Sequence, residues 1–347
     1  MTKLVSQVLS ALVLLLVATL SRADIVRDLY SAQVPVADQS SQALAKASRV
    51  ALSEVLVKVS GTSEVLRYPG IATTLGQARS HVQQYAYARD DNLPGELSAR
   101  FEFDSSFVTG LVTRSGAPLW TANRPQVLVW LVAEDDSGRY FVNLDTAPDL
   151  AQQLLAEFAR RGVPVQLPLF DLADSAAINP QQAWRLDAPA LRGASARYHV
   201  QDVVAGRVAA LAEGNTVGDW SYFHGEERND RSATVADMDA FFREGVAVVA
   251  EIMSARYAIA PTATGEGVSM SVLGVYSYGD YAGIVSWLES LELIEHANVE
   301  RIQGDRIELR LQAQADASQL ASIIELNDRL QPLPVTATGS QLSYQWN

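Results

Sequence analysis

The chain has 347 residues, of which 48% are hydrophobic and 19% are charged. This composition is typical of a globular protein with two or three hydrophobic cores. It contains no cysteine, which excludes disulfides, thiolate metal sites, a cysteine nucleophile and a lipoprotein anchor. The formal net charge is -13, and an acidic surface repels nucleic acid and anionic lipid headgroups, so we expect neither as a partner.

The first 23 residues have the pattern of a secretory signal peptide. Lys3 precedes an apolar run from Val8 to Leu20, and Ser21 and Ala23 are the small residues that a cleavage site needs. The alternative is an uncleaved anchor, but the run is shorter than the roughly 20 residues that cross a bilayer. The sequence therefore predicts export to the periplasm, cleavage after Ala23 and no stable membrane anchor afterwards.

Residues 24–117 predict a small α+β domain. We expect an opening strand over 24–36, and then a helix that Ser40 or Ser41 caps and that Gly61 ends. The hydrophobic pattern then predicts a helix over 71–85, a strand over 96–103 and a short helix that begins after Asp104.

Residues 118–257 predict a central α/β domain. Its first strand, 124–133, is apolar almost throughout, which indicates burial on both faces because a half-exposed strand alternates apolar with polar residues. A helix between Pro148 and Gly162 then leads to a second short strand, so we expect a right-handed parallel crossover. The other expected elements are a strand over 139–143, a helix over 189–198, strands over 201–210, 216–223 and 233–235, and a helix over 237–257.

Residues 258–267 have the composition of a linker, and 268–347 predict a ferredoxin-like domain. Two strand–helix–strand halves joined by a hairpin are typical of the βαββαβ arrangement of that fold. The expected elements are strands over 268–276, 293–302, 306–313 and 341–346, with helices over 280–290 and 316–327. The predicted fold class is thus a mixture of α+β and α/β in three domains.

Familiar catalytic patterns are absent from the sequence. It has no Gly-x-Ser-x-Gly elbow, no Gly-x-x-x-x-Gly-Lys phosphate loop and no His-Glu-x-x-His zinc helix. The four histidines show no metal-ligand spacing: His81, His199, His224 and His296. We therefore expect no metal, no cofactor and no catalytic residue, and the sequence favours a protein that is not an enzyme.

Five residues are candidates for binding a ligand. Asp135 follows the first central strand, and Asp171 and Asp174 follow the second, so the topology predicts that they meet at the carboxyl edge of one sheet. Paired carboxylates there could do acid/base work or hold a cation; the alternative is that they form turns and solvated loops. Trp120 and Arg124 near a strand end could also bind a ligand, although a buried tryptophan more often belongs to a core.

The chain resembles an exported proteobacterial family known as domain of unknown function 2066 over about residues 24–330. The resemblance rests on four segments of this sequence, 29–37, 118–125, 161–171 and 196–198. The first two domains are also similar, at the level of fold alone, to the mixed α/β modules of periplasmic assembly factors, and a shared fold does not fix function. The resemblance implies export and implies no activity.

The sequence thus predicts a periplasmic binding or assembly module with an unidentified protein partner in the envelope. The alternative is a periplasmic hydrolase that uses Asp135, Asp171 and Asp174. An enzyme should bring those carboxylates within about 5–9 Å of each other in a cleft, whereas a binding module should leave them apart.

Overall fold

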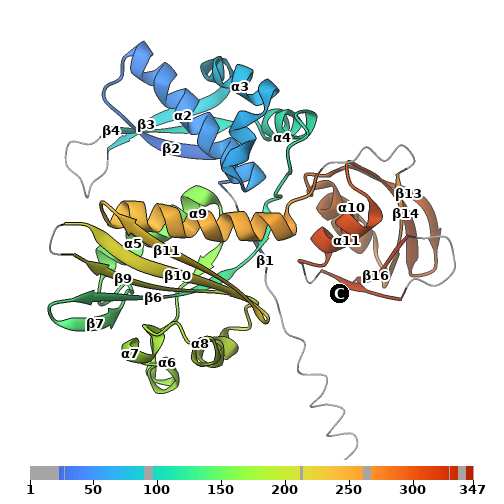
Figure 1. Ribbon diagram of the computed structural model, residues 1–347. Helices are drawn as coiled ribbons and strands as arrows, with labels where there is room; N and C mark the ends of the chain where they lie inside the picture. The colour runs from blue at the N-terminus through green and yellow to red at the C-terminus, as the bar shows by residue number, and fades with distance from the viewer. Residues whose placement is uncertain are drawn as a thin grey trace, which may run out of the picture.

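The computed structural model of the chain describes residues 23–26, 28–89, 97–211, 214–260, 267–327, 329–334 and 341–346. The predicted signal peptide, apart from Ala23, and residues 261–266 of the predicted linker lie outside these residues. The fold is a multi-domain α+β arrangement, as expected. Figure 1 shows the first region above the central one, with the third region to their right.

The first region is an antiparallel sheet covered by helices. Its strands β2 (Ser31–Val36), β4 (Leu97–Phe103) and β3 (Val82–Arg89) lie in the order β2-β4-β3. Ser40 caps α2 (Ser41–Ser60) by accepting a hydrogen bond from the backbone of Ala43, and α4 (Ser105–Arg114) begins after Asp104 as expected. A 3-10 turn, η1 (Ser63–Arg67), follows α2.

Two expectations for the first region are wrong. The helix expected over 71–85 is shorter: α3 (Pro69–Leu75) and a 3-10 turn, η2 (Ala78–His81), lead into β3, because the alternating residues from Val82 onward pair with β4. The strand expected over 24–36 is two strands. β1 (Ala23–Ile25) leaves the sheet of β2 and pairs with β5 (Asn123–Pro125) far along the chain.

The central region is built on a mixed sheet in the order β11-β10-β9-β6-β7, with β8 also paired to β6. Its first strand, β6 (Val127–Asp135), runs parallel to β8 (Val165–Gln166) and β9 (Asp202–Ala210) and antiparallel to β7 (Gly138–Phe141). The expected parallel crossover is therefore present. The edge strands expected over 216–223 and 233–235 instead form one long hairpin, β10 (Thr216–His224) and β11 (Glu227–Val235), whose outer strand is polar and largely exposed.

Helices cover both faces of this sheet (Figure 1). On one face α5 (Pro148–Arg161) and α9 (Met238–Tyr257) pack on Val127, Val129 and Leu131. On the other, the short helices α6 (Leu172–Ala177), α7 (Pro180–Ala183) and α8 (Ala188–Ser195) form the layer beneath Leu128, Trp130 and Val132. These six residues of β6 are all at most 1% exposed, so the expected burial on both faces is confirmed.

The third region has the predicted βαββα order, but it departs from a ferredoxin-like sandwich at its end: the last strand is parallel to the first, and a fifth strand that was not predicted lies at the edge. The sheet runs β13-β14-β12-β16-β15, with β12 and β16 parallel and the other neighbours antiparallel. α10 (Tyr278–Glu289) and α11 (Ala317–Ile324) each begin with a capping box, formed at Ser277 and at Asp316. The strands are β12 (Val268–Leu273), β13 (Ile294–Gln303), β14 (Arg306–Ala313), β15 (Leu330–Pro332) and β16 (Leu342–Trp346).

A charge should be equally damaging on either face of β6. Val129→Asp and Trp130→Asp each place a carboxylate in an apolar cluster without a partner, and we expect each to lower the free energy of unfolding by about 4 kcal/mol or more. Tyr276→Asp is the control, because Tyr276 is 82% exposed. Soluble yield and melting temperature measure the effect, and a silent Trp130→Asp would contradict the two-sided sheet.

Candidate functional site

Arg124 is a fully buried cation that joins two regions of the chain. Its guanidinium donates hydrogen bonds of 2.7–2.8 Å to four backbone carbonyls, those of Lys58, Trp120, Thr121 and Gly162. Lys58 lies near the end of α2, and Gly162 directly follows α5. Burial lowers the pKa of Arg124 to about 9. Arg124 thus satisfies carbonyls at the ends of two helices and is a structural residue.

Gly162 permits this close approach. It ends α5 in the left-handed conformation, with a φ of 66°, where glycine carries no steric penalty. A Cβ at this position would lie 2.7 Å from Lys58 Cγ and 2.9 Å from Arg124 Nη1. Lys58 is itself buried and donates to the carbonyls of Asp28 and Ser31. Burial lowers the pKa of Lys58 to about 8.

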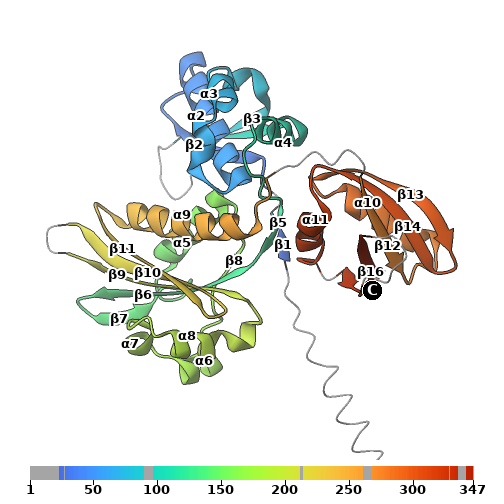
Figure 2. The same cartoon turned by 45° about the vertical axis from the view of Figure 1, so that its right-hand side comes forward.

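The segment 117–125, which we call the junction segment, touches all three regions. The Trp120 ring is fully buried and stacks on the Arg124 guanidinium at 3.9 Å, so it belongs to a core and is closed to a ligand. Asn123 Nδ2 donates to the Ile323 carbonyl of α11, and the Ala122 amide donates to Glu292 in the third region. Figure 2 shows the β1–β5 ladder where the three regions meet.

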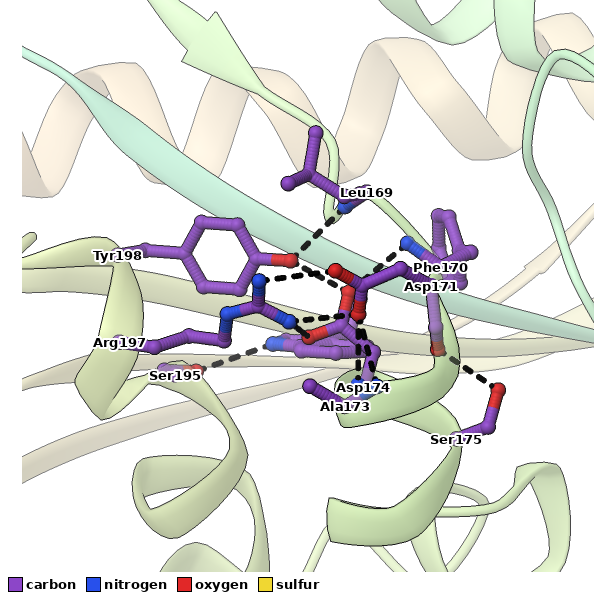
Figure 3. A network of polar contacts seen from close by, with 10 residues as sticks. Leu169, Phe170, Asp171, Ala173, Asp174, Ser175, Ser195, Arg197 and Tyr198 are labelled. Carbon is purple, nitrogen blue, oxygen red and sulfur yellow. Dashed lines mark hydrogen bonds and ion pairs between the residues drawn. The ribbon is translucent and has the colours of Figure 1, made fainter.

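Asp171 and Asp174 lie together in a closed polar network (Figure 3). Arg197 binds Asp171 through two hydrogen bonds of 2.6 and 2.9 Å and reaches Asp174 at 3.1 Å. Asp174 is 2% exposed and also accepts from the Tyr198 hydroxyl at 2.5 Å and from the Phe170 amide at 2.8 Å. Both carboxylates are therefore occupied by groups of the chain itself.

The network also fixes the loop around it. Asp171 caps α6 by accepting from the amides of Ala173 and Asp174, and the Leu169 amide donates to the Tyr198 hydroxyl. The hydrogen bonds from Arg197 hold the pKa of Asp171 at about 2. Burial, together with Asp174, raises the pKa of Tyr198 to about 12. A carboxylate with so low a pKa is a poor general acid or base near neutral pH.

The expected meeting of three carboxylates at one sheet edge does not occur. β8 is only two residues long and ends opposite Leu128, near the start of β6. Asp135 is the last residue of β6, beside the β6–β7 turn. There it accepts hydrogen bonds from the amide and hydroxyl of Ser137 in the β6–β7 turn. Asp135 is a turn residue, apart from Asp171 and Asp174.

A cavity of about 310 Å³, which we call the interdomain cavity, lies between the central and third regions. Its central wall comes from the start of β6, the end of β8, the start of β9 and the end of α9, and its other wall from the residues after α11. The residues that define it are Gln126, Gln166, Tyr198, His199, Gln201, Asp202 and Tyr257 from the central region, with Glu325 and Leu326 from the third.

Asp202 is a carboxylate enclosed at the start of β9. It is 0% exposed, and its Oδ1 accepts from the Tyr222 hydroxyl and bonds His224 Nδ1 at 2.8 Å. Its Oδ2 is closed to solvent. Tyr257 faces the same carboxylate, and burial of Tyr257, the Asp202 charge and a hydrogen bond to Asp202 raise the pKa of the Tyr257 hydroxyl.

The Asp202–His224 pair is not presented to a nucleophile. Ser195 lines a neighbouring cavity together with His224. Its hydroxyl, however, donates to the Leu191 carbonyl at 2.7 Å and accepts from Trp130 Nε1 at 3.0 Å. The hydroxyl proton is thus directed into α8, and the pair lacks the nucleophile–base hydrogen bond of a hydrolase.

The sequence analysis missed Asp202, His224 and Tyr257. His224 lies opposite Asp202 in the antiparallel register of β9 and β10, and that register is not visible as a motif. The available signal was Asp202 itself, an acid directly before Val203 and Val204 in a strand that is otherwise apolar except for Arg207.

Among the described residues, no cluster of three or more His, Cys, Asp or Glu side chains could hold a metal ion. Within the same residues, no helix has both the length and the apolar character that a membrane span requires.

Replacing Arg124 should weaken the whole junction. Arg124→Lys keeps the charge but loses the planar fork that reaches four carbonyls, so we expect the free energy of unfolding to fall by about 3 kcal/mol or more. Thermal or denaturant unfolding measures the change, with Arg231→Lys on the exposed strand β11 as the matched control. Equal stability of the two variants would show that the carbonyl contacts contribute little.

The Arg197–Asp171 pair should make stability depend on acidic pH. Because the pKa of Asp171 is lowered from 3.8 to about 2 in the folded chain, its contribution is present above pH 3.8 and is lost as the pH falls toward 2. Arg197→Gln should therefore lower the melting temperature near neutral pH, and the difference from the parent chain should shrink across that window. Arg231→Gln is the control; a difference that is constant with pH would exclude this linkage.

The family comparison covers the first region and the start of the junction segment. A family model described as a domain of unknown function (DUF8605) matches residues 23–121. The family is a different one from domain of unknown function 2066, so that expectation is wrong. The search of curated proteins gave no match. A solved structure titled "Crystal structure of uncharacterized protein" aligns at 13% identity over 38% of this chain and 90% of that chain, with a TM-score of 0.18, which is too low to support an argument about the fold.

Proposed function

We propose that this protein is a binding or assembly module of the cell envelope, without catalytic activity, and that the interdomain cavity is its binding site. One observation carries the proposal: a cavity between the central and third regions is lined by residues of both, among them the exposed Gln201 and Glu325. A ligand that fills the cavity would contact the central and third regions at once.

The contacts of the other acids support binding over hydrolysis. Asp171 and Asp174 are held by Arg197 and Tyr198, while Asp135 lies in a separate turn. A hydrolase needs a pair of carboxylates in a cleft with room for water and substrate between them. Here the side chain of Arg197 occupies the space between Asp171 and Asp174.

Location in the envelope is part of the proposal and rests on the export pattern of residues 1–23. Cleavage after Ala23 would leave Asp24 as the first residue. Mass spectrometry of the mature chain checks this part separately, and a chain that retains Met1 in a membrane fraction would contradict it.

Photo-crosslinking inside cells tests the binding site. A benzophenone amino acid is placed at Gln201 or at Glu325, the exposed residues on the two walls of the cavity, and at Arg231 on the far strand β11 as the control. We expect the same adduct, a small molecule or a protein, from both cavity positions and none from Arg231. The absence of an adduct at both cavity positions, or an equal adduct at all three, would contradict the proposal.

A further inference from the structure

We propose that a groove on the first region, which we call the basic groove, binds an acidic segment of a partner protein. Its volume is about 930 Å³, and it lies between the middle of α2 and the turns that follow α3. Three of its nine lining residues are the cations Lys46, Arg49 and Arg79, and none of these nine described residues is acidic. The basic groove is separate from the interdomain cavity, so this inference goes beyond the proposed function and does not depend on it.

The three cations are open to an incoming ligand. Their side chains are exposed, and within the described residues none of them forms an ion pair with a carboxylate of the chain. The acids that flank the two cations of α2 in sequence have other partners. Asp38 accepts from the Ser40 amide at 2.7 Å, and Glu54 contacts Arg160 of α5 at 3.6 Å. A bound carboxylate would therefore not have to displace an acid of the chain itself.

The cations are spaced along the groove. Lys46 and Arg49 are three residues apart on α2, which is about 4.5 Å along the helix axis. The guanidinium of Arg79 lies at the first turn of α2, where its Nη1 donates to the Ser41 carbonyl at 3.4 Å. Ser41 precedes Arg49 by eight residues, so the three cations are distributed over roughly 12 Å of the helix. A phosphate group is much smaller than this distance, whereas three acids at alternate positions of an extended segment span roughly 13 Å.

The charge balance of the first region favours an acidic partner at this place. Residues 24–117 contain nine Lys and Arg and ten Asp and Glu, a formal charge of -1, while the whole chain has -13. The acidic surplus thus lies after residue 117. Because screening limits the reach of an exposed charge to about 8–10 Å at physiological ionic strength, the field in the basic groove is set by its own three cations.

The floor of the basic groove suits a peptide main chain. It is formed by the small or apolar residues Ala45, Leu75, Gly76 and Ala78, so a bound backbone can lie close to it. The exposed Gln77 adds an amide that can both donate and accept hydrogen bonds. An extended segment would place its acids on the three cations and its backbone on this floor.

Peptides of equal length test the charge requirement with the full chain. Fluorescence anisotropy follows a capped peptide of three glutamates alternating with glycines, and its glutamine counterpart, each with a neutral dye. We expect the glutamate peptide to bind, with an affinity that falls as salt rises because salt screens exposed ion pairs. The glutamine counterpart should bind at least about tenfold more weakly. No binding of the glutamate peptide, or equal binding of the two, would overturn the inference.

Charge reversal at exposed positions locates the site. Each cation is replaced in turn, as Lys46→Glu, Arg49→Glu or Arg79→Glu, and each variant should bind the glutamate peptide about fivefold more weakly or less. Arg231→Glu on β11 is the matched control, since it changes the net charge equally and should leave binding unchanged. Melting temperatures show that each variant is folded. Unchanged binding by all three reversals, or an equal loss in the control, would overturn the inference.

The same variants distinguish a protein segment from other anionic occupants. Inorganic phosphate that competes at the concentration of the peptide would indicate a small anion. Phosphatidylglycerol vesicles that bind the parent chain but not Arg49→Glu would indicate a membrane surface, and a dimer in light scattering that Arg49→Glu dissociates would indicate a second copy. Each of these results would overturn the acidic segment as the occupant. Crosslinking at Gln201 and Glu325 tests the proposed function separately, because neither residue lines the basic groove.

Discussion

The desolvated guanidinium of Arg124 is the interaction on which the arrangement of this protein depends. A charge with no exposed surface persists only when its donors are matched, and here four carbonyls match them, two from the junction segment and two from the ends of α2 and α5. Helix ends leave carbonyls unsatisfied. Hydrogen bonds to these carbonyls offset the cost of desolvating Arg124, and they also join the first region to the central one.

The position of the interdomain cavity follows from this constraint. Arg124 immediately precedes Pro125 and Gln126, which line the cavity, and then β6 begins. On the other side of the junction segment, Asn123 holds α11 through the Ile323 carbonyl, two residues before Glu325. Both walls are thus tied to neighbouring residues of one fixed segment, and the cavity is a consequence of how the three regions are joined.

The sequence predicted most of the fold because the strongest signals are local. The apolar run of β6, the caps at Ser40 and Asp104 and the two halves of the third region all appear in the structure. The errors occur where pairing between distant segments decides the secondary structure. The residues from Val82 onward pair with β4, and Ala23 pairs with β5. The predicted acidic site does not form because Asp135 binds Ser137 in its own turn while Asp171 and Asp174 bind Arg197, partners that no periodicity reveals.

Arg124 and Asp202 are two buried charges that the fold compensates in different ways. Both are fully buried, and each breaks the apolar pattern expected of its position, which proteins tolerate chiefly where a compensating interaction exists. For Arg124 the compensation comes from backbone carbonyls, which reach all three guanidinium nitrogens. For Asp202 it comes from the side chains of Tyr222, His224 and Tyr257. Composition could not distinguish these two residues, because the partners of both come from segments distant in the sequence.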